Sequence, residues 1–264
     1  MNVEAGMGKA LNAGLGFLLG LILIFSATGS GHALELGARA YYWFPSINAD
    51  MRADEDGSRG TELDLEDDLG MGDENYPSVE IYGGVGRHHL SLMYTPIDYS
   101  GSAILNQDIR FEGKAYSRGT AVDADLEAWM LDLEYQVDLI NLENFLAGFS
   151  LGAIGKVKYL DGEARLNSDA VGETKETFSL PIPMVGAGAH IGLLANILEA
   201  RAKVTGIGYS GNVFYEAMAD ISWTPFPFLD LHCGYRHLKI DVDEDDFYLN
   251  SSFSGPFLAL SVGF

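Results

Sequence analysis

The chain has 264 residues, 47% of them apolar, and a formal net charge of −22 at pH 7. That charge disfavours direct binding of DNA, RNA or anionic lipid. The single cysteine, Cys233, excludes an internal disulfide and a multi-cysteine metal site. The 32 glycines, together with 13 tyrosines and 14 phenylalanines, indicate an all-β protein.

The first 33 residues have the pattern of a secretory signal peptide. Lys9 precedes a short apolar stretch at 15–25, and small residues follow it up to Ala33 in the sequence GHA. The apolar stretch is shorter than the roughly 20 residues that a helical membrane span requires, which favours a cleaved leader over a retained transmembrane helix. We therefore expect residues 1–33 to be removed and residues 34–264 to form the folded domain.

The rest of the chain, taken in order, alternates apolar and polar residues at the period of a β-strand. The clearest stretch is WMLDLEYQVDLI, in which Trp129, Leu131 and Leu133 share one face and Asp132 and Glu134 share the other. Strands are predicted in this way at 34–44, 78–86, 89–95, 129–140, 145–159, 185–194, 198–204, 213–223, 229–236 and 254–264. The expected fold is an all-β, antiparallel up-and-down transmembrane β-barrel of roughly ten strands, with eight or twelve as alternatives.

The connections between these segments differ in length. Short turns are predicted near GRHH, INLEN, LLAN and TPFPF, and long polar loops at 46–75, 106–121, 162–177 and 241–250. Short turns at one rim and long loops at the other are typical of barrels in a bacterial outer membrane. Aromatic residues at strand ends (41–44, Trp223, Phe226 and Phe228) also favour a membrane. A secreted soluble β-barrel that binds a ligand would show the same alternation with its faces reversed, so it stays open as an alternative.

The C-terminal strand carries a sharper signal. Leu258, Leu260, Val262 and Phe264 alternate with small residues up to the last position. This ending resembles the assembly signal of Gram-negative outer-membrane β-barrels. The stretch GYRHLKIDVDEDD, followed by FSGPFLALSVGF, resembles the closing hairpin of small proteobacterial barrels of largely unassigned function. The resemblance implies location in the cell outer membrane, recognition by the barrel-assembly machinery, and contact with outer-membrane lipid and lipopolysaccharide. It implies no activity.

In such a barrel the polar faces line the lumen. The lumen-lining candidates are Glu35, Arg39, Glu80, Asp132, Glu134, Asp138, Lys156, Lys158, Glu199, Arg201, Lys203, Glu216, Asp220, Asp230, His232 and Arg236. Nine of them are acids and six are lysine or arginine. Long charged side chains fill much of a narrow barrel. Two interpretations follow, a salt-bridged plug with a structural or surface role, or a narrow small-solute pore with a mixed-charge lumen that disfavours anions.

Acidic residues gather in the loop at 46–75 and again in DVDEDD at 241–246. Solvated loops and weak binding of divalent cations are both open interpretations, because Ca²⁺ and Mg²⁺ prefer carboxylate ligands. A rim hydrolase is a further alternative, since His237 lies near Asp241 and Asp243 and a His–Asp pair can activate water. No second acidic pair and no diagnostic Ser–His spacing accompanies it. We expect no catalytic residue, no bound metal and no cofactor.

Overall fold

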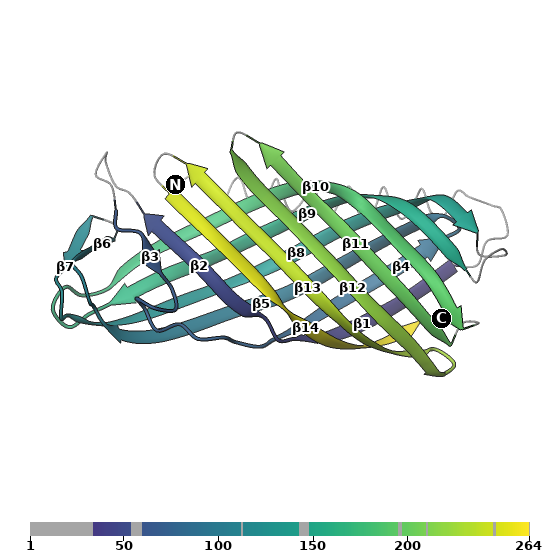
Figure 1. The fold of residues 1–264 in the computed structure, drawn as a ribbon, viewed down its shortest axis with the longest axis horizontal. Coiled ribbons are helices and arrows are strands. Elements are labelled where there is room, and N and C mark those ends of the chain that lie inside the picture. The colour runs from purple at the N-terminus through teal and green to yellow at the C-terminus, as the bar shows by residue number, and fades with distance from the viewer. Residues whose placement is uncertain are drawn as a thin grey trace, which may run out of the picture. The chain divides into compact units, whose positions relative to one another are not determined.

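A computed structural model describes residues 34–53, 60–111, 113–142, 148–194, 197–209, 211–244 and 247–263. The unit from Glu35 to Phe264 is an antiparallel β-barrel, closed by pairing of its first and last strands (Figure 1). The predicted signal peptide at 1–33 and the terminal Phe264 lie outside the described residues, so both stay predictions. Among the described residues, no helix is long and apolar enough to cross a membrane.

Ten strands form the ring and follow one another around it in chain order. They are β1 (Leu34–Trp43), β4 (Tyr76–Val85), β5 (His88–Ile104), β8 (Ala121–Leu142), β9 (Phe149–Asn167), β10 (Thr174–Leu194), β11 (Leu198–Tyr209), β12 (Asn212–Phe226), β13 (Leu229–Glu244) and β14 (Phe247–Gly263). Each predicted strand corresponds to one of them, which confirms the antiparallel up-and-down barrel. Four further strands lie near its long-loop end: β2 (Ser46–Ala53), β3 (Leu63–Asp64), β6 (Ile109–Phe111) and β7 (Lys114–Tyr116).

Two of the segments predicted as long loops are mostly strand. β9 and β10 pair from Ser150 with His190 up to Leu166 with Thr174, and β13 and β14 include residues 241–244 and 247–250. The polar residues that suggested loops lie on the outer faces of long strands. β8 and β10 have 22 and 21 residues, whereas β11 has 12, so one side of the barrel is longer than the other. Figure 1 shows β8 and β9 continuing past the end of β11.

The segment predicted as a loop at 46–75 begins with a strand. β14 pairs with β1 along Phe257–Gly263 and with β2 along Phe247–Ser254. β1 and β2 therefore act as one long strand, interrupted at Phe44 and Pro45. Pro45 has no N–H to donate to a strand partner, and the Phe44 N–H instead donates to the carbonyl of Pro256 at 3.0 Å.

The acidic segment 60–75 covers the long-loop end of the barrel instead of extending into solvent. Its buried apolar side chains are Leu63, Leu65, Leu69 and Met71. The Asp64 carboxylate caps a turn by accepting the N–H groups of Glu66 and Asp67 at 2.9 and 2.7 Å. No described His, Cys, Asp and Glu side chains are grouped so as to hold a metal ion. Binding of divalent cations at the acidic loops stays a prediction.

The alternating residues of β14 show which face of the sheet is apolar. Leu258, Leu260 and Val262 are 55%, 44% and 44% exposed, whereas Ala259 and Ser261 between them are 7% and 0% exposed. The other strands repeat this pattern, with exposed apolar residues outside and buried charged residues inside. A soluble barrel has the opposite arrangement, and a membrane barrel has this one. The soluble ligand-binding alternative is therefore wrong.

The aromatic residues divide between the two faces. Trp223, Phe226 and Phe228 are exposed near the short-turn end, as the predicted interfacial belt requires. Tyr41 and Trp43, predicted with them, are instead buried in the lumen at 6% and 1% exposure. They follow the inward-facing Arg39 at the strand period of two, which outweighs aromatic character in setting their direction.

Candidate functional site: the barrel lumen

The structure places every lumen-lining candidate on the inner face of the barrel. Those around an open cavity are Glu35, Arg39, Glu80, Glu134, Asp138, Glu199, Arg201, Lys203 and Asp220. Those buried deeper are Asp132, Lys156, Lys158, Glu216 and Arg236. Asp230 and His232 join this inner set through the Ser261 hydroxyl, at 3.1 and 2.9 Å. The lumen has three layers: a polar cavity at the short-turn end, a charge cluster in the middle, and an apolar core at the long-loop end.

The charge cluster consists of Asp132, Glu134, Lys156, Lys158, Glu216 and Arg236. Each of these side chains is at most 10% exposed. The Lys158 Nζ lies 2.7 Å from an Asp132 oxygen, and the Arg236 Nε donates to Glu216 at 2.6 Å. Burial makes such charges costly unless they are paired, and here both signs are present in contact.

Several of these ion pairs span the lumen. Lys156 on β9 donates to Glu216 on β12, although β10 and β11 separate those strands in the ring. Glu134 on β8 likewise accepts from Lys203 on β11 at 2.9 Å. Contacts between non-neighbouring strands exist only where side chains cross the interior. The cluster therefore crosses the interior of the barrel at this level.

An apolar core continues from the cluster toward the long-loop end. The Arg236 guanidinium lies 4.7 Å from the centre of the Trp43 ring, where the two layers meet. Beyond it, the buried side chains include Ile47, Tyr76, Ile97, Tyr99, Met130, Ile182, Leu238, Ile240, Phe253 and Phe257. Leu63, Leu65 and Met71 of the segment 60–75 belong to the same core. Sequence reasoning missed this layer because it placed only charged residues and histidine in the lumen.

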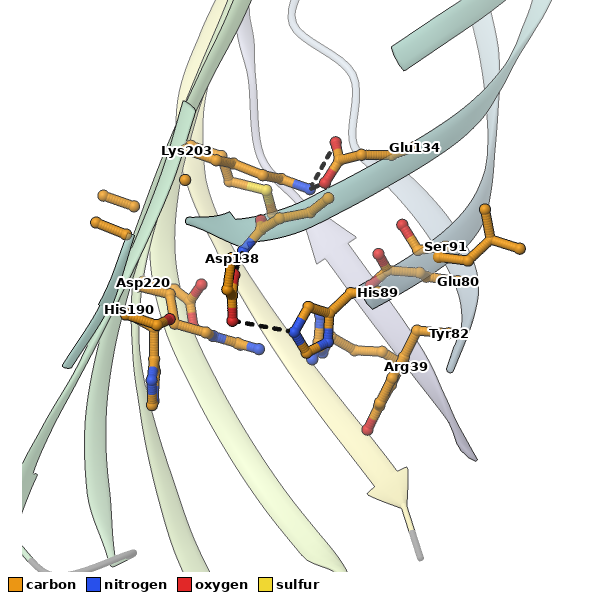
Figure 2. Close-up of a pocket in the computed structure, with 18 of the residues that line it drawn as sticks. Arg39, Glu80, Tyr82, His89, Ser91, Glu134, Asp138, His190, Lys203 and Asp220 are labelled. Atoms are coloured by element: carbon orange, nitrogen blue, oxygen red, sulfur yellow. Dashed lines mark hydrogen bonds and ion pairs between the residues drawn. The ribbon is translucent and has the colours of Figure 1, made fainter. Parts of the chain in front are cut away.

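The cavity has a volume of about 390 Å³. Its lining residues come from the first residues of β1, β5 and β11 and the last residues of β8 and β10, so it lies at the short-turn end. Figure 2 shows these side chains converging from opposite walls, with Lys203 bound to Glu134 and His89 bound to Asp138. In outer-membrane barrels the short turns face the periplasm, which predicts that the cavity opens to the periplasmic side.

Ion pairs order the cavity walls. The Arg39 guanidinium donates to Glu80 at 2.8 Å, and Glu80 also accepts the Tyr41 hydroxyl at 2.7 Å. On the facing wall, Arg201 donates to Asp220 at 2.8 Å. The imidazole of His232 lies 3.1 Å from the same Asp220 oxygen, which ties this wall to Ser261 of β14.

Several lining residues were not among the sequence candidates, namely Tyr82, His89 and Gln136. Their positions carried a usable signal, since Tyr82 lies two residues after Glu80, and Gln136 lies between Glu134 and Asp138. Apart from histidine, uncharged residues in the alternation were passed over. Glycines at positions 152 and 188 make room here, because the Gln136 side chain lies within 2.8 and 2.6 Å of where their Cβ atoms would be.

His237, the candidate for a rim hydrolase, alternates with the inward-facing Arg236 and Leu238 and so faces outward. Its ring nitrogens contact the hydroxyls of Tyr215, at 2.8 Å, and of Ser254. Among the described residues, its hydrogen-bond partners are hydroxyls and not carboxylates. The structure thus does not join His237 to the acidic pair that the hydrolase alternative required.

Comparison with known proteins supports the fold of this chain but assigns it to no family. No family model matches the chain, and no curated protein matches it. The outer-membrane protease OmpT from Escherichia coli matches with a TM-score of 0.60 at 10% identity, over 87% of this chain and 97% of that chain. The β domain of the Bordetella autotransporter BrkA matches with a TM-score of 0.42 at 15% identity, over 86% and 98%.

Together, the closed ring of ten strands, the apolar outer face and the likeness to the OmpT fold define the class of this protein. It is an outer-membrane β-barrel of the Gram-negative type, located in the cell outer membrane. At 10% identity, the likeness to OmpT shows the fold alone.

Proposed function

We propose that this protein is a closed outer-membrane barrel that displays a rigid β-structure at the cell surface and conducts no solute. The observation that carries the proposal is the set of ion pairs across the lumen, from Lys156 to Glu216 and from Lys203 to Glu134. The apolar core stands behind them, so water and ions lack a polar path to the long-loop end. This favours the structural and surface role over the small-solute pore.

The part of the barrel proposed to lie outside the membrane begins where the outer face changes from apolar to charged. Tyr94, Trp129 and Tyr159 form an aromatic row across β5, β8 and β9, with ring centres 6.2 and 5.4 Å apart. Such rows lie at membrane–water interfaces. Beyond Trp129, β8 continues through 121–128, roughly 26 Å of strand at about 3.3 Å per residue.

The outer face of this extension is charged instead of apolar. Its acidic residues are Asp98, Asp123, Asp125, Glu127, Asp161 and Glu163. Glu163 is paired with Arg165 and with Lys175 of the next strand. A charged surface of paired strands needs water around it, which supports its position outside the bilayer.

A catalytic role is not part of the proposal. The OmpT likeness concerns the fold, and His237 contacts hydroxyls on the outer face. We therefore propose that the protein is not a rim hydrolase.

Cysteine labelling on intact cells tests which end is displayed. In a Cys233→Ala background, Lys114→Cys at the exposed β6–β7 hairpin and Arg87→Cys at a short turn each introduce one thiol. A maleimide on a polymer too large to pass porins is expected to label Lys114→Cys on intact cells and Arg87→Cys only after lysis. Labelling of Arg87→Cys alone on intact cells, with a periplasmic marker protected, would overturn the proposed orientation.

A further inference from the structure

The periplasmic cavity has more negative charge than its own cations neutralise. Its lining holds six carboxylates (Glu35, Glu80, Glu134, Asp138, Glu199 and Asp220) and three permanent cations (Arg39, Arg201 and Lys203). Each of the cations is already engaged: Arg39 with Glu80, Arg201 with Asp220, and Lys203 with Glu134. With neutral imidazoles, the lining has a formal charge of −3.

The three remaining carboxylates are Glu35, Asp138 and Glu199, and the contacts described for the last two are with histidine and glutamine side chains. Asp138 is 3% exposed and contacts His89 at 3.2 Å and the Gln136 amide at 2.8 Å. Glu199 contacts His190 at 3.2 Å. Asp138 is the buried member of the three, and a buried carboxylate without a permanent counter-charge is costly, so it favours an added cation. Glu35 and Glu199 are more exposed and line the same cavity.

Glu35 extends this arrangement along one wall. Its carboxylate and the His89 ring both approach Gly84, at 3.5 and 2.8 Å from the position a Cβ would take there. Glu35 and Asp138 therefore lie near the same imidazole, and Glu199 enters from β11. The three carboxylates thus come from three strands around one space.

The chemistry of the space selects an organic cation. The described residues include no group of three His, Cys, Asp or Glu side chains placed to hold a metal ion. Separated carboxylates instead suit a molecule with several ammonium groups, each donating charge-assisted hydrogen bonds. The volume of about 390 Å³ lies within the range of small-molecule sites. An anion would meet guanidinium and ammonium groups that are already paired.

We propose that the periplasmic cavity binds a small organic cation with two or more amino groups, and that Glu35, Asp138 and Glu199 supply the counter-charges. The site is closed on its inner side by the charge cluster, so the ligand enters and leaves on the periplasmic side. This binding is independent of surface display, and the two proposals fail separately.

Calorimetric titration of the refolded full barrel in non-ionic detergent tests the site. The probe is 1,4-diaminobutane, with 1,4-butanediol as the neutral analogue and succinate as the anionic one. We expect saturable binding of one diamine per barrel and no binding of the diol or of succinate. Absence of diamine binding, or tighter binding of succinate, would overturn the proposal.

Single substitutions locate the binding. Glu35→Gln and Glu199→Gln are each expected to weaken diamine binding about tenfold, because each removes one charge-assisted contact. Glu163→Gln on the outer face removes the same charge elsewhere and is expected to leave the affinity unchanged. Heat-modifiable gel migration shows which variants are folded, and Glu199→Gln carries the test if Glu35→Gln does not fold. Equal affinity in wild type and both cavity variants would contradict the assignment.

Discussion

Replacing Glu216 by leucine is expected to lower the free energy of unfolding by about 3–5 kcal/mol, the cost of leaving buried charge unpaired. Glu216 accepts from both Lys156 and Arg236, and its carboxylate lies 3.5 Å from the Lys158 Nζ. Without it, three buried cations face only Asp132 and Glu134. Urea unfolding of the refolded barrel, followed by tryptophan fluorescence, measures the loss.

A second variant separates lost charge balance from lost packing. Removing Glu216 and Arg236 together leaves Lys156 and Lys158 opposite two carboxylates, so the cluster stays balanced. We expect the Glu216→Leu, Arg236→Met double variant to be more stable than Glu216→Leu alone. Glu163→Leu on the exposed outer face is the control and should change little. If Glu216→Leu is no less stable than this control, the cluster is not the buried network described.

Replacing Gly255 by alanine is expected to cost at least about 3 kcal/mol, at the upper end of overpacking. A Cβ at this position would lie 1.9 Å from the Phe44 carbonyl oxygen and 2.7 Å from the Pro45 Cα, both backbone atoms. This is the point where β14 changes partner from β1 to β2 and where the Trp43 Nε1–H donates to the Gly255 carbonyl at 3.2 Å. An added methyl group would therefore force β14 away from the chain at Phe44 and Pro45, where the barrel closes.

Gly155 provides the matched control, because a Cβ there meets nothing within 4 Å. Gly155→Ala is expected to be neutral or to stabilise the barrel by about 0.4–1 kcal/mol through the unfolded chain. Heat-modifiable gel migration and the yield in the outer-membrane fraction measure how much of each variant is folded. Equal yields would show that β14 can move away from Phe44 and Pro45. The close approach at Gly255 would then not constrain the fold.

Local alternation predicted most of the strands, because successive side chains in a strand point to opposite faces of the sheet. Asp132 and Glu134 fixed the inner face of β8, and the same parity carries to Met130 and Ala124, which are buried in the apolar core. The prediction stopped at 129, because beyond that point the outer face of the strand becomes polar as well. A strand outside the membrane has no lipid to require apolar residues, so its signal weakens.

The height of each inward-facing side chain along the barrel axis could not be predicted from the sequence. Lys156 and Glu216 are 60 residues apart, and which of them meet across the interior depends on strand number and stagger. Periodicity gives the direction of a side chain but not its height in the barrel. The separation into cavity, charge cluster and apolar core therefore became visible only once the ring was closed. Likewise, the apolar residues Leu63, Leu65 and Met71 carried no strand pattern, yet they cover that core.

Ion conductance of the refolded protein in a planar lipid bilayer tests the closed barrel most directly. With insertion verified by flotation with liposomes, the ion pairs across the lumen and the apolar core predict no steady open-channel current. A reproducible unit conductance, with cations preferred over anions, would contradict the closed barrel and restore the narrow mixed-charge pore.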